Sequence, residues 1–596
     1  MLYDVILSYH HHQVFVRQLT LQTDQLSSST SLRLPFTLCC QTTTSISTPA
    51  GLNNPFRAST SSCPSKRSQP LPSTIKNQVL LVFENAQLHG ELYPSHTRWN
   101  ARAGGQRVHL VVGGDGRYYS PECIQKIIKL AAGNQVKHLI IGHKGILSTP
   151  AVSNLIRKRK ADGGILLTAS HNPGGPNADF GIKYNVSNGG PAPEGVTDKV
   201  YEITKTLKSY KMIELPEVEG RSLATRPQNL GPISIEIVDS VADYLVLLKS
   251  IFDFDSIKAY LHGSPPPLKV LFDGMHGVTG PYGHAIFVET LGLSADSIQN
   301  CVSSPDFNGG HPDPNLTYAH ELVSRVDKEN IGFGAASDGD GDRNMIYGKD
   351  AFVTPSDSVA IIADWAQEAI PYFKSGVKGL ARSMPTSGAI DLVAKAKNLE
   401  VFEVPTGWKF FGNLMDAGRL SICGEESFGT GSDHIREKDG LWAVVAWLSI
   451  LAAAEKQGIK NGIKGVLQDH YKKYGRSFFS RYDYEEVESA GAAKMMSNIE
   501  SAFEKSDFIG SSLSAETSNT SFEVKESGNF SYTDPIDKSV SKGQGLFVNS
   551  PTEVGSKNEQ EYDQDTQVGL KPLIEVALKL SKLQEFTGRE KPTVIT

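Results

Sequence analysis

The sequence predicts an α/β protein of several domains built on parallel sheets. From Val108 onward, short apolar runs typical of buried strands alternate with segments of helical periodicity. Several of these runs end in glycine-containing polar loops, and the carboxyl ends of parallel strands are where open α/β sheets place their ligands. The chain has 596 residues, more than one hydrophobic core normally serves, so we expect roughly four domains of about 150 residues each.

Five elements justify the parallel sheet in the first part of the chain. Strand, helix and strand follow one another at the spacing of βαβ units, which bury a parallel sheet under helices. They are the strand VHLVVGGDG (108–116), the helix PECIQKIIKLAAG (121–133), the strand HLIIG (138–142), the helix TPAVSNLIRKRK (149–160) and the strand GGILLTAS (163–170). Ser170 is therefore expected at the carboxyl end of a parallel strand.

A rigid turn follows Ser170, since Pro173–Pro176 reads PGGP and continues neither a strand nor a helix. One interpretation is a tight turn in which Ser170 only caps a backbone group. The other is a nucleophile held clear of the sheet, with His171 and Lys183 nearby and turn amides able to cradle a phosphate. The loop is not the G-x-S-x-G elbow of α/β hydrolases, because Thr168 stands two residues before the serine.

Four later segments repeat this pattern, each taking a strand into a polar loop, so we expect a shared cleft lined by such loops. They are LKVLFDGMHG (268–277), IGFGAASDGDGDR (331–343), LEVFEVPTGWKF (399–410) and LSICGEESFG (420–429).

The segment DGDGDR (338–343) predicts a metal site. Asp338, Asp340 and Asp342 alternate with glycines, and three carboxylates so close together need a cation to offset their repulsion. Oxygen ligands select a hard ion, Mg²⁺ or Ca²⁺. An EF-hand would need glycine at loop position six and glutamate at position twelve, where this chain has Arg343 and Lys349. Three protein ligands leave room for a phosphate oxygen, which suits phosphoryl transfer; a solvated acidic turn is the alternative.

Three further loops carry weaker signals. GEESFG (424–429) offers two carboxylates and a hydroxyl that suit sugar hydroxyls, although a capping turn would look the same. In PTGWKF (405–410), Trp408 is expected in the core rather than at a ligand. GSDHIREKDG (431–440) adds a basic cluster that could bind phosphate, with a solvated helix start as the alternative; the cluster consists of His434, Arg436 and Lys438.

Composition excludes some classes of function. The chain is 39% hydrophobic and 21% charged with a net charge of −6, which gives no reason to expect a nucleic-acid or anionic-membrane partner. The most apolar stretch, Leu441–Ala454, has 14 residues and predicts a buried helix rather than a membrane span. Six cysteines, of which only Cys39 and Cys40 are close together, form no disulfide framework or zinc motif. These features favour a reducing compartment.

Residues 1–76 differ from the rest. They are rich in Ser and Thr, and their only acidic residues are Asp4 and Asp24, against six Lys or Arg. We expect this segment to be disordered. Its composition is similar to that of organelle transit peptides, while an untargeted extension or a wrongly assigned start are the alternatives.

Taken together, the motifs resemble those of one family. TASHNPGG (168–175), DGDGDR, PTGWKFFGN (405–413) and GEESFGTGSDHIREKDG (424–440) stand in the order found in phosphoglucomutases of the phosphohexomutase superfamily. The resemblance runs from about Val108 to Gly545 and resumes from about Thr566 to Thr596. IRKRKADGG (156–164) and the closing TGREKPTVIT look like plant plastidic members, which implies a plastid location, with the cytoplasm as the alternative.

The resemblance implies three α/β domains with mixed or parallel sheets and a smaller, truncated C-terminal α+β domain. On this reading, the units are an extension at 1–76 and domains at 77–240 (phosphoserine loop), 241–354 (metal loop), 355–470 (sugar-binding loop) and 471–596 (phosphate-binding loop missing). The implied reaction interconverts glucose 1-phosphate and glucose 6-phosphate, with Mg²⁺ as cofactor and glucose 1,6-bisphosphate as activator and intermediate. The implied partners are sugar phosphates alone, bound by a monomer, with no nucleic acid and no membrane.

The resemblance also implies roles for individual residues. Ser170 carries the phosphoryl group, Lys183 is the favoured general base, and His171 and Arg343 assist the transfer. The metal ligands are Ser170, Asp338, Asp340 and Asp342. The substrate-binding residues are Thr406, Gly407, Glu425 and Ser427 for the sugar, and Lys438 for its phosphate.

Two expected family elements are missing from the sequence. The region Thr74–Arg107 shows no GTSGLRK-like segment, which normally brings an arginine to the active site. After Ser539–Gly545, the chain reads LFVNSPTEVGSKNEQEYDQ where the family carries an RLSGTGS-like loop that grips the distal phosphate. Losing two or three charge-assisted bonds would slow turnover on the order of 10³-fold. A catalytically impaired, sugar-phosphate-binding phosphoprotein and a mutase for another hexose phosphate are therefore the alternative functions.

Overall fold

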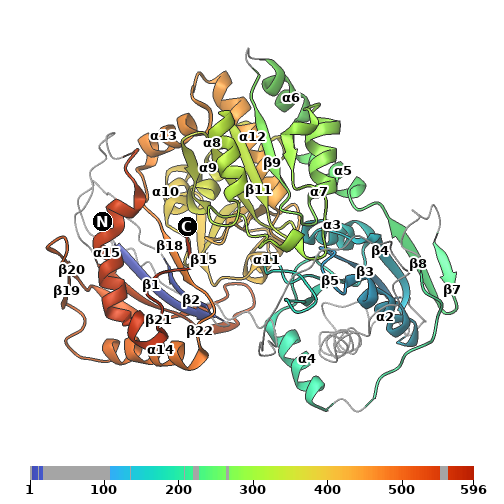
Figure 1. Ribbon diagram of the computed structural model, residues 1–596, viewed down its shortest axis with the longest axis horizontal. Coiled ribbons are helices and arrows are strands. Elements are labelled where there is room, and N and C mark those ends of the chain that lie inside the picture. Colours follow the sequence, from blue (N-terminus) through green and yellow to red (C-terminus); the bar gives the residue numbers. More distant parts are fainter. Residues whose placement is uncertain are drawn as a thin grey trace, which may run out of the picture.

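The computed structural model describes residues 3–10, 13–17, 108–550 with breaks at 135, 207–208, 219–226 and 264–266, and 562–596. The predictions for Thr74–Arg107 and for the segment after Ser550 up to residue 561 lie outside the described residues. The described chain forms three α/β units and a C-terminal unit, which follow one another along an arc (Figure 1). The predicted multi-domain α/β architecture is confirmed.

The first unit is a six-stranded sheet of order β6-β5-β3-β4-β8-β7, in which β3, β4, β5 and β8 are parallel and the two edge strands antiparallel. All five predicted elements are present. The elements are β3 (Val108–Gly114), α2 (Ser120–Gly133), β4 (Val136–Ile146), α3 (Thr149–Arg159), β5 (Gly163–Leu167), β6 (Ile182–Val186), α4 (Glu194–Thr206), β7 (Gln228–Leu230) and β8 (Ile233–Val238). The Ser148 side chain caps α3 by accepting from the Ala151 amide, 3.2 Å away.

The second unit has a five-stranded sheet of order β10-β9-β11-β12-β13. Its core strands β9 and β11 are parallel, and β11 turns back into antiparallel β12 through the DGDGDR loop. Its elements are α5 (Ala242–Ile251), α6 (Phe254–Gly263), β9 (Val270–Asp273), α7 (Gly280–Gly283), a π-helix (His284–Thr290), β10 (Ile298–Gln299), α8 (His320–Glu329), β11 (Phe333–Ser337), β12 (Asn344–Gly348) and β13 (Ala351–Val353).

The third unit is a four-stranded sheet of order β15-β14-β16-β17 between helices. Its central helix α12 begins at Gly440, capped by the Asp439 side chain, and contains the apolar stretch Leu441–Ala454 predicted to be a buried helix. Its elements are α9 (Pro355–Ala369), β14 (Gly379–Ser383), α10 (Ala389–Lys397), β15 (Glu400–Val404), α11 (Trp408–Asp416), β16 (Ile422–Gly424), β17 (Thr430–Ser432), α12 (Gly440–Lys456) and α13 (Gly462–Tyr474). Among the described helices, none is both long and apolar enough to cross a membrane.

The C-terminal unit contains a six-stranded sheet of order β21-β22-β1-β2-β18-β23 with helices against it. The strands β1 and β2 come from the opposite end of the chain and lie between β22 and β18 (Figure 1). The elements are β1 (Tyr3–His10), β2 (Gln13–Arg17), β18 (Arg481–Tyr484), α14 (Ser489–Phe503), β19 (Ser512–Ala515), β20 (Thr520–Glu523), β21 (Glu526–Thr533), β22 (Val540–Ser550), α15 (Thr566–Ser581), α16 (Leu583–Thr587) and β23 (Val594–Ile595).

The expectation of disorder for 1–76 does not hold for β1 and β2. β1 pairs antiparallel with β22, from Tyr3 opposite Ser550 to Leu7 opposite Leu546, and β2 pairs antiparallel with β18. The local sequences YDVILSYH and QVFVR are rich in β-branched and aromatic residues, which favour strands. The prediction of disorder rested on the average composition of residues 1–76, which does not reveal two short strands within it. The rest of 1–76 lies outside the described residues.

The described residues form six clusters of buried apolar side chains, of which two are the most relevant to the assembly of the units. One continuous cluster of buried apolar side chains runs through the first three units and includes most of α9 and α12. A second cluster lies within the C-terminal unit, around Tyr484, Met495 and Leu570. The C-terminal unit also touches the third unit, where Phe410 and Tyr532 meet edge to face at 5.6 Å between ring centroids. The sites on the first three units are therefore built on one shared core.

Candidate active site

Ser170 is presented by the buried strand β5, as predicted. The strand residues Gly163–Leu167 are fully buried, and the chain then turns so that Ser170 adopts a positive φ of 54°. Its backbone amide donates to Thr168 Oγ1 over 2.8 Å. A non-glycine residue with positive φ is uncommon and is seen often at functional sites. The turn thus holds the serine in one orientation at the end of the strand.

A buried ion pair supports this turn from behind. Arg117 is fully buried, and its Nε donates to Asp115 Oδ2 over 2.8 Å. The same guanidinium donates to the carbonyl oxygens of Ser170 and Asp179, each over 2.9 Å, and lies over the ring of Phe307. This pair was not expected from the sequence, although GGDGR (113–117) is a glycine-containing polar loop after a predicted strand, like the candidate loops that follow it. Arg117 therefore fixes the backbone of the serine loop.

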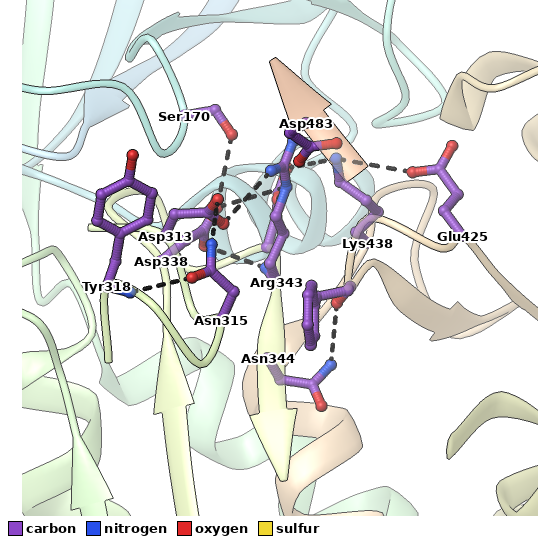
Figure 2. A network of polar contacts seen from close by, with 12 residues as sticks. Ser170, Asp313, Asn315, Tyr318, Asp338, Arg343, Asn344, Glu425, Lys438 and Asp483 are labelled. Atoms are coloured by element: carbon purple, nitrogen blue, oxygen red, sulfur yellow. Dashed lines mark hydrogen bonds and ion pairs between the residues drawn. The ribbon is translucent and has the colours of Figure 1, made fainter. Parts of the chain in front are cut away.

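The three aspartates lie beside Ser170, as predicted. One oxygen from each of Asp338, Asp340 and Asp342 lies within 4.8 Å of the others, and all three residues are buried. Ser170 Oγ is 3.5 Å from Asp338 Oδ2 (Figure 2). Gly341 makes the turn possible with a φ of 82°. The serine of the first unit and the acidic loop of the second thus form one site.

The electrostatics of this triad fit a cation. Burial, together with the charges of Asp340 and Asp342, raises the pKa of Asp338 well above its usual range. Two buried carboxylate oxygens, Asp340 Oδ1 and Asp342 Oδ1, have no hydrogen-bond partner. Buried anionic oxygens of this kind are costly unless a cation satisfies them. An all-oxygen set suits a hard divalent ion such as Mg²⁺.

Three cationic side chains lie around the triad. One comes from the first unit, one from the third unit and one from the end of the acidic loop itself. Lys183 Nζ on β6 is 3.3 Å from Asp340 Oδ2, and Lys438 Nζ is 3.3 Å from Asp342 Oδ2. The Arg343 guanidinium lies 3.9 Å from both Asp338 and Asp342, and its buried Nε has no hydrogen-bond partner. Figure 2 shows Ser170, Arg343 and Lys438 pointing toward the same small region. Such positive charge around a fixed serine suits the stabilisation of a transferring phosphoryl group.

Lys183 is held in its charged form. Burial opposes the ammonium, but the carboxylates of Asp340, Asp342 and Glu437 outweigh it and raise the lysine pKa above its usual value. In this setting the ammonium supplies positive charge beside the triad, and the role of general base that the resemblance implies stays a prediction. The proximity of Lys183 to these carboxylates could not be expected from any local pattern in the sequence.

His171 is stacked on a histidine that the sequence did not single out. The rings of His171 and His311 are nearly parallel, with centroids 5.9 Å apart, and the ring of Tyr318 lies 4.0 Å beyond His311. His171 Nδ1 and His311 Nε2 are buried without a hydrogen-bond partner. Burial, with the charge of Arg343, lowers the pKa of His171 well below its usual value. A neutral imidazole therefore adjoins the serine.

The predicted sugar-binding residues come together only in part. Gly407, with a φ of 132°, precedes α11, and its amide donates to Glu425 Oε1 over 2.8 Å. Glu425 Oε2 lies 3.9 Å from Lys438 Nζ, which links the two loops of the third unit to the triad (Figure 2). Thr406 adjoins Gly407, and Ser427 lies partly exposed in the turn between β16 and β17. Trp408 is buried against Phe411, as expected of a core residue.

Of the predicted basic cluster, only Lys438 lies beside the triad. His434 is buried between Ser432 Oγ, 2.6 Å from Nδ1, and Asp439 Oδ2, 2.9 Å from Nε2. Arg436 donates to Asp416 and to two backbone carbonyls. His434 therefore bonds within its own loop, whereas Arg436 ties the loop to Asp416 of α11.

Other residues at the site were not found from the sequence. Thr149 Oγ1 donates to Asp340 Oδ2 over 2.9 Å, Asp313 lies 3.8 Å from Arg343, and Asn185 donates to Glu437 over 2.8 Å. All these pairs join residues that are far apart in the chain. For these residues, the sequence offered one indication of a place at the site, which is that Glu437 directly precedes Lys438.

Family models match most of the described chain. Domains I, II and III of the phosphoglucomutase/phosphomannomutase alpha/beta/alpha family match residues 83–211, 242–351 and 354–474. A phosphoglucomutase-1 C-terminal domain matches residues 476–554.

Curated relatives and a solved structure agree with this assignment. The chain is 57% identical to a phosphoglucomutase of Aspergillus fumigatus over 89% of this chain and 98% of that protein. It is 54% identical to human phosphoglucomutase-1 over 82% of this chain and 91% of that protein. The crystal structure of the phosphoprotein pp63/parafusin, a phosphoglucomutase from Paramecium, superposes with a TM-score of 0.73 at 40% identity, covering 88% of this chain and 94% of that one. The chain therefore belongs to the phosphoglucomutase family of phosphohexomutases, which are intramolecular phosphotransferases.

Proposed function

We propose that this chain interconverts glucose 1-phosphate and glucose 6-phosphate through a phosphorylated Ser170. The observation that carries the proposal is the convergence of Ser170, the three buried aspartates and the cations Lys183, Arg343 and Lys438 at one point. The relatives that match over most of their length are phosphoglucomutases, and this favours glucose phosphates over other hexose phosphates as substrates.

The proposed reaction consists of two phosphoryl transfers. In the first, the C6 hydroxyl of glucose 1-phosphate bonds to phosphorus as the bond between phosphorus and the Ser170 oxygen breaks, and the proton of this hydroxyl passes through a neighbouring base to the Ser170 oxygen. In the second, the Ser170 oxygen bonds to the C1 phosphorus of glucose 1,6-bisphosphate as the bond between that phosphorus and the C1 oxygen breaks. The proton of the serine hydroxyl passes to the C1 oxygen, and glucose 6-phosphate leaves. A serine oxygen needs such a polar setting, because its unassisted hydroxyl is a weak nucleophile.

The residues around Ser170 would act by position and charge. Lys183, Arg343 and Lys438 would offset the negative charge on the phosphoryl oxygens in both transfers. Lys183 is the favoured general base of the transfers, and His171 would help to relay the proton beside the serine. Gly407 and Glu425, with Thr406 and Ser427 on the same two loops, would hold the sugar hydroxyls.

The acidic triad would hold a Mg²⁺ ion together with Ser170. When bound, the ion would supply positive charge to a phosphoryl oxygen. The two unpartnered buried oxygens of Asp340 and Asp342 support a cation at this point, and their all-oxygen chemistry favours Mg²⁺ over a softer metal.

The test is conversion of glucose 1-phosphate by the purified chain with Mg²⁺ and a trace of glucose 1,6-bisphosphate. We expect turnover that Ser170→Ala abolishes. A folded chain that becomes phosphorylated on Ser170 without turning over would instead be the impaired phosphoprotein, as the missing RLSGTGS-like loop would predict. Faster conversion of mannose 1-phosphate or N-acetylglucosamine 1-phosphate would identify another hexose as the substrate.

Location and assembly are separate proposals. The composition of residues 1–76 supports import into a plastid, whereas the pairing of β1 and β2 with the C-terminal sheet counts against removal of the first 17 residues. A fluorescent reporter fused to residues 1–80 tests import, and a cytosolic reporter would contradict it. We also propose a monomer, and light scattering that gives twice the mass of 64.7 kDa would contradict it.

A further inference from the structure

Two lysines approach the acidic triad from different units of the protein. Lys183 belongs to β6 in the first unit and contacts Asp340, while Lys438 belongs to the loop before α12 in the third unit and contacts Asp342. Both contacts are 3.3 Å long. The two ammonium groups serve the same phosphoryl group only if β6 and this loop keep a fixed spacing.

A buried hydrogen bond joins the two elements next to these lysines. Asn185 Nδ2 donates to Glu437 Oε1 over 2.8 Å and to the Gly189 carbonyl over 2.9 Å. Asn185 lies two residues after Lys183 on the strand and so on the same face of it, and Glu437 directly precedes Lys438. Asn185 is fully buried and Glu437 is 4% exposed. The bond therefore links the backbone segments that carry the two lysines.

The contact between the loop and the first unit continues at Arg436, one residue before Glu437. The Arg436 amide donates to Ser153 Oγ over 3.1 Å. A methyl group on Gly190 would lie only 3.1 Å from the Arg436 carbonyl oxygen, which shows how closely the backbones approach. In this packed strip, Asn185 and Glu437 are the bonded pair that stands closest in sequence to the two lysines.

The charges around Glu437 are consistent with a link that does not depend on ionisation. Burial, with the neighbouring Asp342, raises the pKa of Glu437 to about 8, while Lys183, Asn185 and Lys438 act against this rise. A carboxylate and a carboxylic acid both keep an oxygen that accepts from the Asn185 amide. The hydrogen bond therefore persists in either form.

We propose that Asn185 and Glu437 are a positioning pair that fixes the spacing of Lys183 and Lys438 around the transferring phosphoryl group. The role attributed to the lysines rests on the proposed function. Misplacement of a reacting group by about 1 Å can cost on the order of 10²-fold in rate. Loss of the pair is therefore expected to lower kcat while leaving KM nearly unchanged.

The first experiment compares four variants in turnover and in the phosphorylation of Ser170 by glucose 1,6-bisphosphate. Asn185→Ala and Glu437→Ala remove the bond, and both should lower kcat at least 10-fold with KM within about 3-fold. Glu437→Gln keeps the acceptor oxygen and should retain a third or more of the wild-type kcat. Asn188→Ala is the matched control, because Asn188 joins the same two units through an exposed bond to Asp416, and it should leave kcat unchanged.

Two results would overturn the proposal. Asn185→Ala with more than half of the wild-type kcat would show that the spacing does not depend on this bond. Equal losses in Glu437→Gln and Glu437→Ala would assign Glu437 a role through its charge or proton instead.

A second measurement does not depend on activity. Acetylation of individual lysines, followed by peptide mass spectrometry, reports how firmly Lys183 and Lys438 are held. Asn185→Ala should raise the labelling rate of both at least 3-fold relative to the exposed Lys579, whereas Glu437→Gln and Asn188→Ala should not. A wild-type chain without turnover would contradict the proposed function alone, and unchanged labelling in Asn185→Ala would contradict the positioning pair alone.

Discussion

The first three units and the C-terminal unit are assembled in different ways. Each of the first three sheets is made from one continuous stretch of chain, within 108–238, 270–353 and 379–432. The C-terminal sheet instead combines strands from both ends, with β1 and β2 between β22 and β18. Contacts close in sequence form more readily than contacts that must first close a long loop. The catalytic machinery therefore stands on the part of the molecule that folds from local information.

The largest effect on stability is expected from removing β1 and β2. β1 and β2 form three ladders of four or five residue pairs, with each other, with β22 and with β18. At about 1 kcal/mol for each lost hydrogen bond, the loss on deleting residues 1–20 should be comparable to the whole stability of a typical domain, roughly 5–15 kcal/mol. We expect rapid amide exchange throughout 481–550 with protection retained in 108–474. Deletion of residues 30–49, outside the described strands, is the control.

Protection of 481–550 that survives the deletion of residues 1–20 would contradict this view. The C-terminal sheet would then be closed without β1 and β2, and the two ends of the chain would be independent.

The second largest effect is expected on turnover, when the acidic triad on the first three units is altered. Asp340→Asn removes a charge from the triad and a partner of Lys183, so Ser170 phosphorylation and turnover should fall at least 10³-fold, about 4 kcal/mol in the activation free energy. The fold should persist, because asparagine has nearly the volume of aspartate and keeps an oxygen that can accept the hydrogen bond from Thr149. Asp350→Asn makes the same chemical change at an exposed turn in the same unit and should keep the wild-type rate. A comparable loss in both variants would show that the effect is not specific to the triad.

Local patterns explain what the sequence could predict. The buried run Gly163–Leu167 and the turn after it predicted the place of Ser170, and the alternating aspartates predicted a metal site, because both signals lie within a few residues. The link from Asn185 to Glu437 and the stack of His171 on His311 join residues far apart in the chain. The pairing of β1 with β22 is more distant still. Such contacts depend on the packing of whole units, which periodicity and spacing do not encode.

Acid should lower the free energy of unfolding of the first three units through His470. This histidine is a buried residue of α13 in the third unit. Burial lowers the pKa of His470 to about 4, against about 6.5 in an unfolded chain. The unfolded state therefore binds more protons between these values, so stability is full above pH 6.5 and falls as the pH drops toward 4. The loss is up to about 3 kcal/mol, at 1.36 kcal/mol for each pKa unit. Denaturant titrations at several pH values measure it.

His470→Gln removes the titration and should flatten this part of the stability profile. His320→Gln, on α8 of the second unit, provides a comparison with a histidine that is not fully buried. If wild type and His470→Gln lose the same stability between pH 6.5 and 4, buried His470 is not the source of the acid sensitivity.

The smallest effect is expected where the two regions meet. Tyr318 of the second unit donates its hydroxyl to Glu485 Oε2, directly after β18, over 3.0 Å. Tyr318→Phe keeps the ring against His311 but removes this bond, at a cost of about 1 kcal/mol. Tyr347→Phe is the matched control, because the Tyr347 hydroxyl bonds Asp327 within the second unit itself. Amide exchange during denaturant unfolding can be followed separately in residues 108–474 and in residues 481–550. Tyr318→Phe should separate the unfolding transitions of these two parts, whereas Tyr347→Phe should shift only the transition of residues 108–474. If Tyr318→Phe shifts the transitions of both parts equally, the C-terminal unit unfolds together with the rest. Its different assembly would then have no consequence for cooperativity.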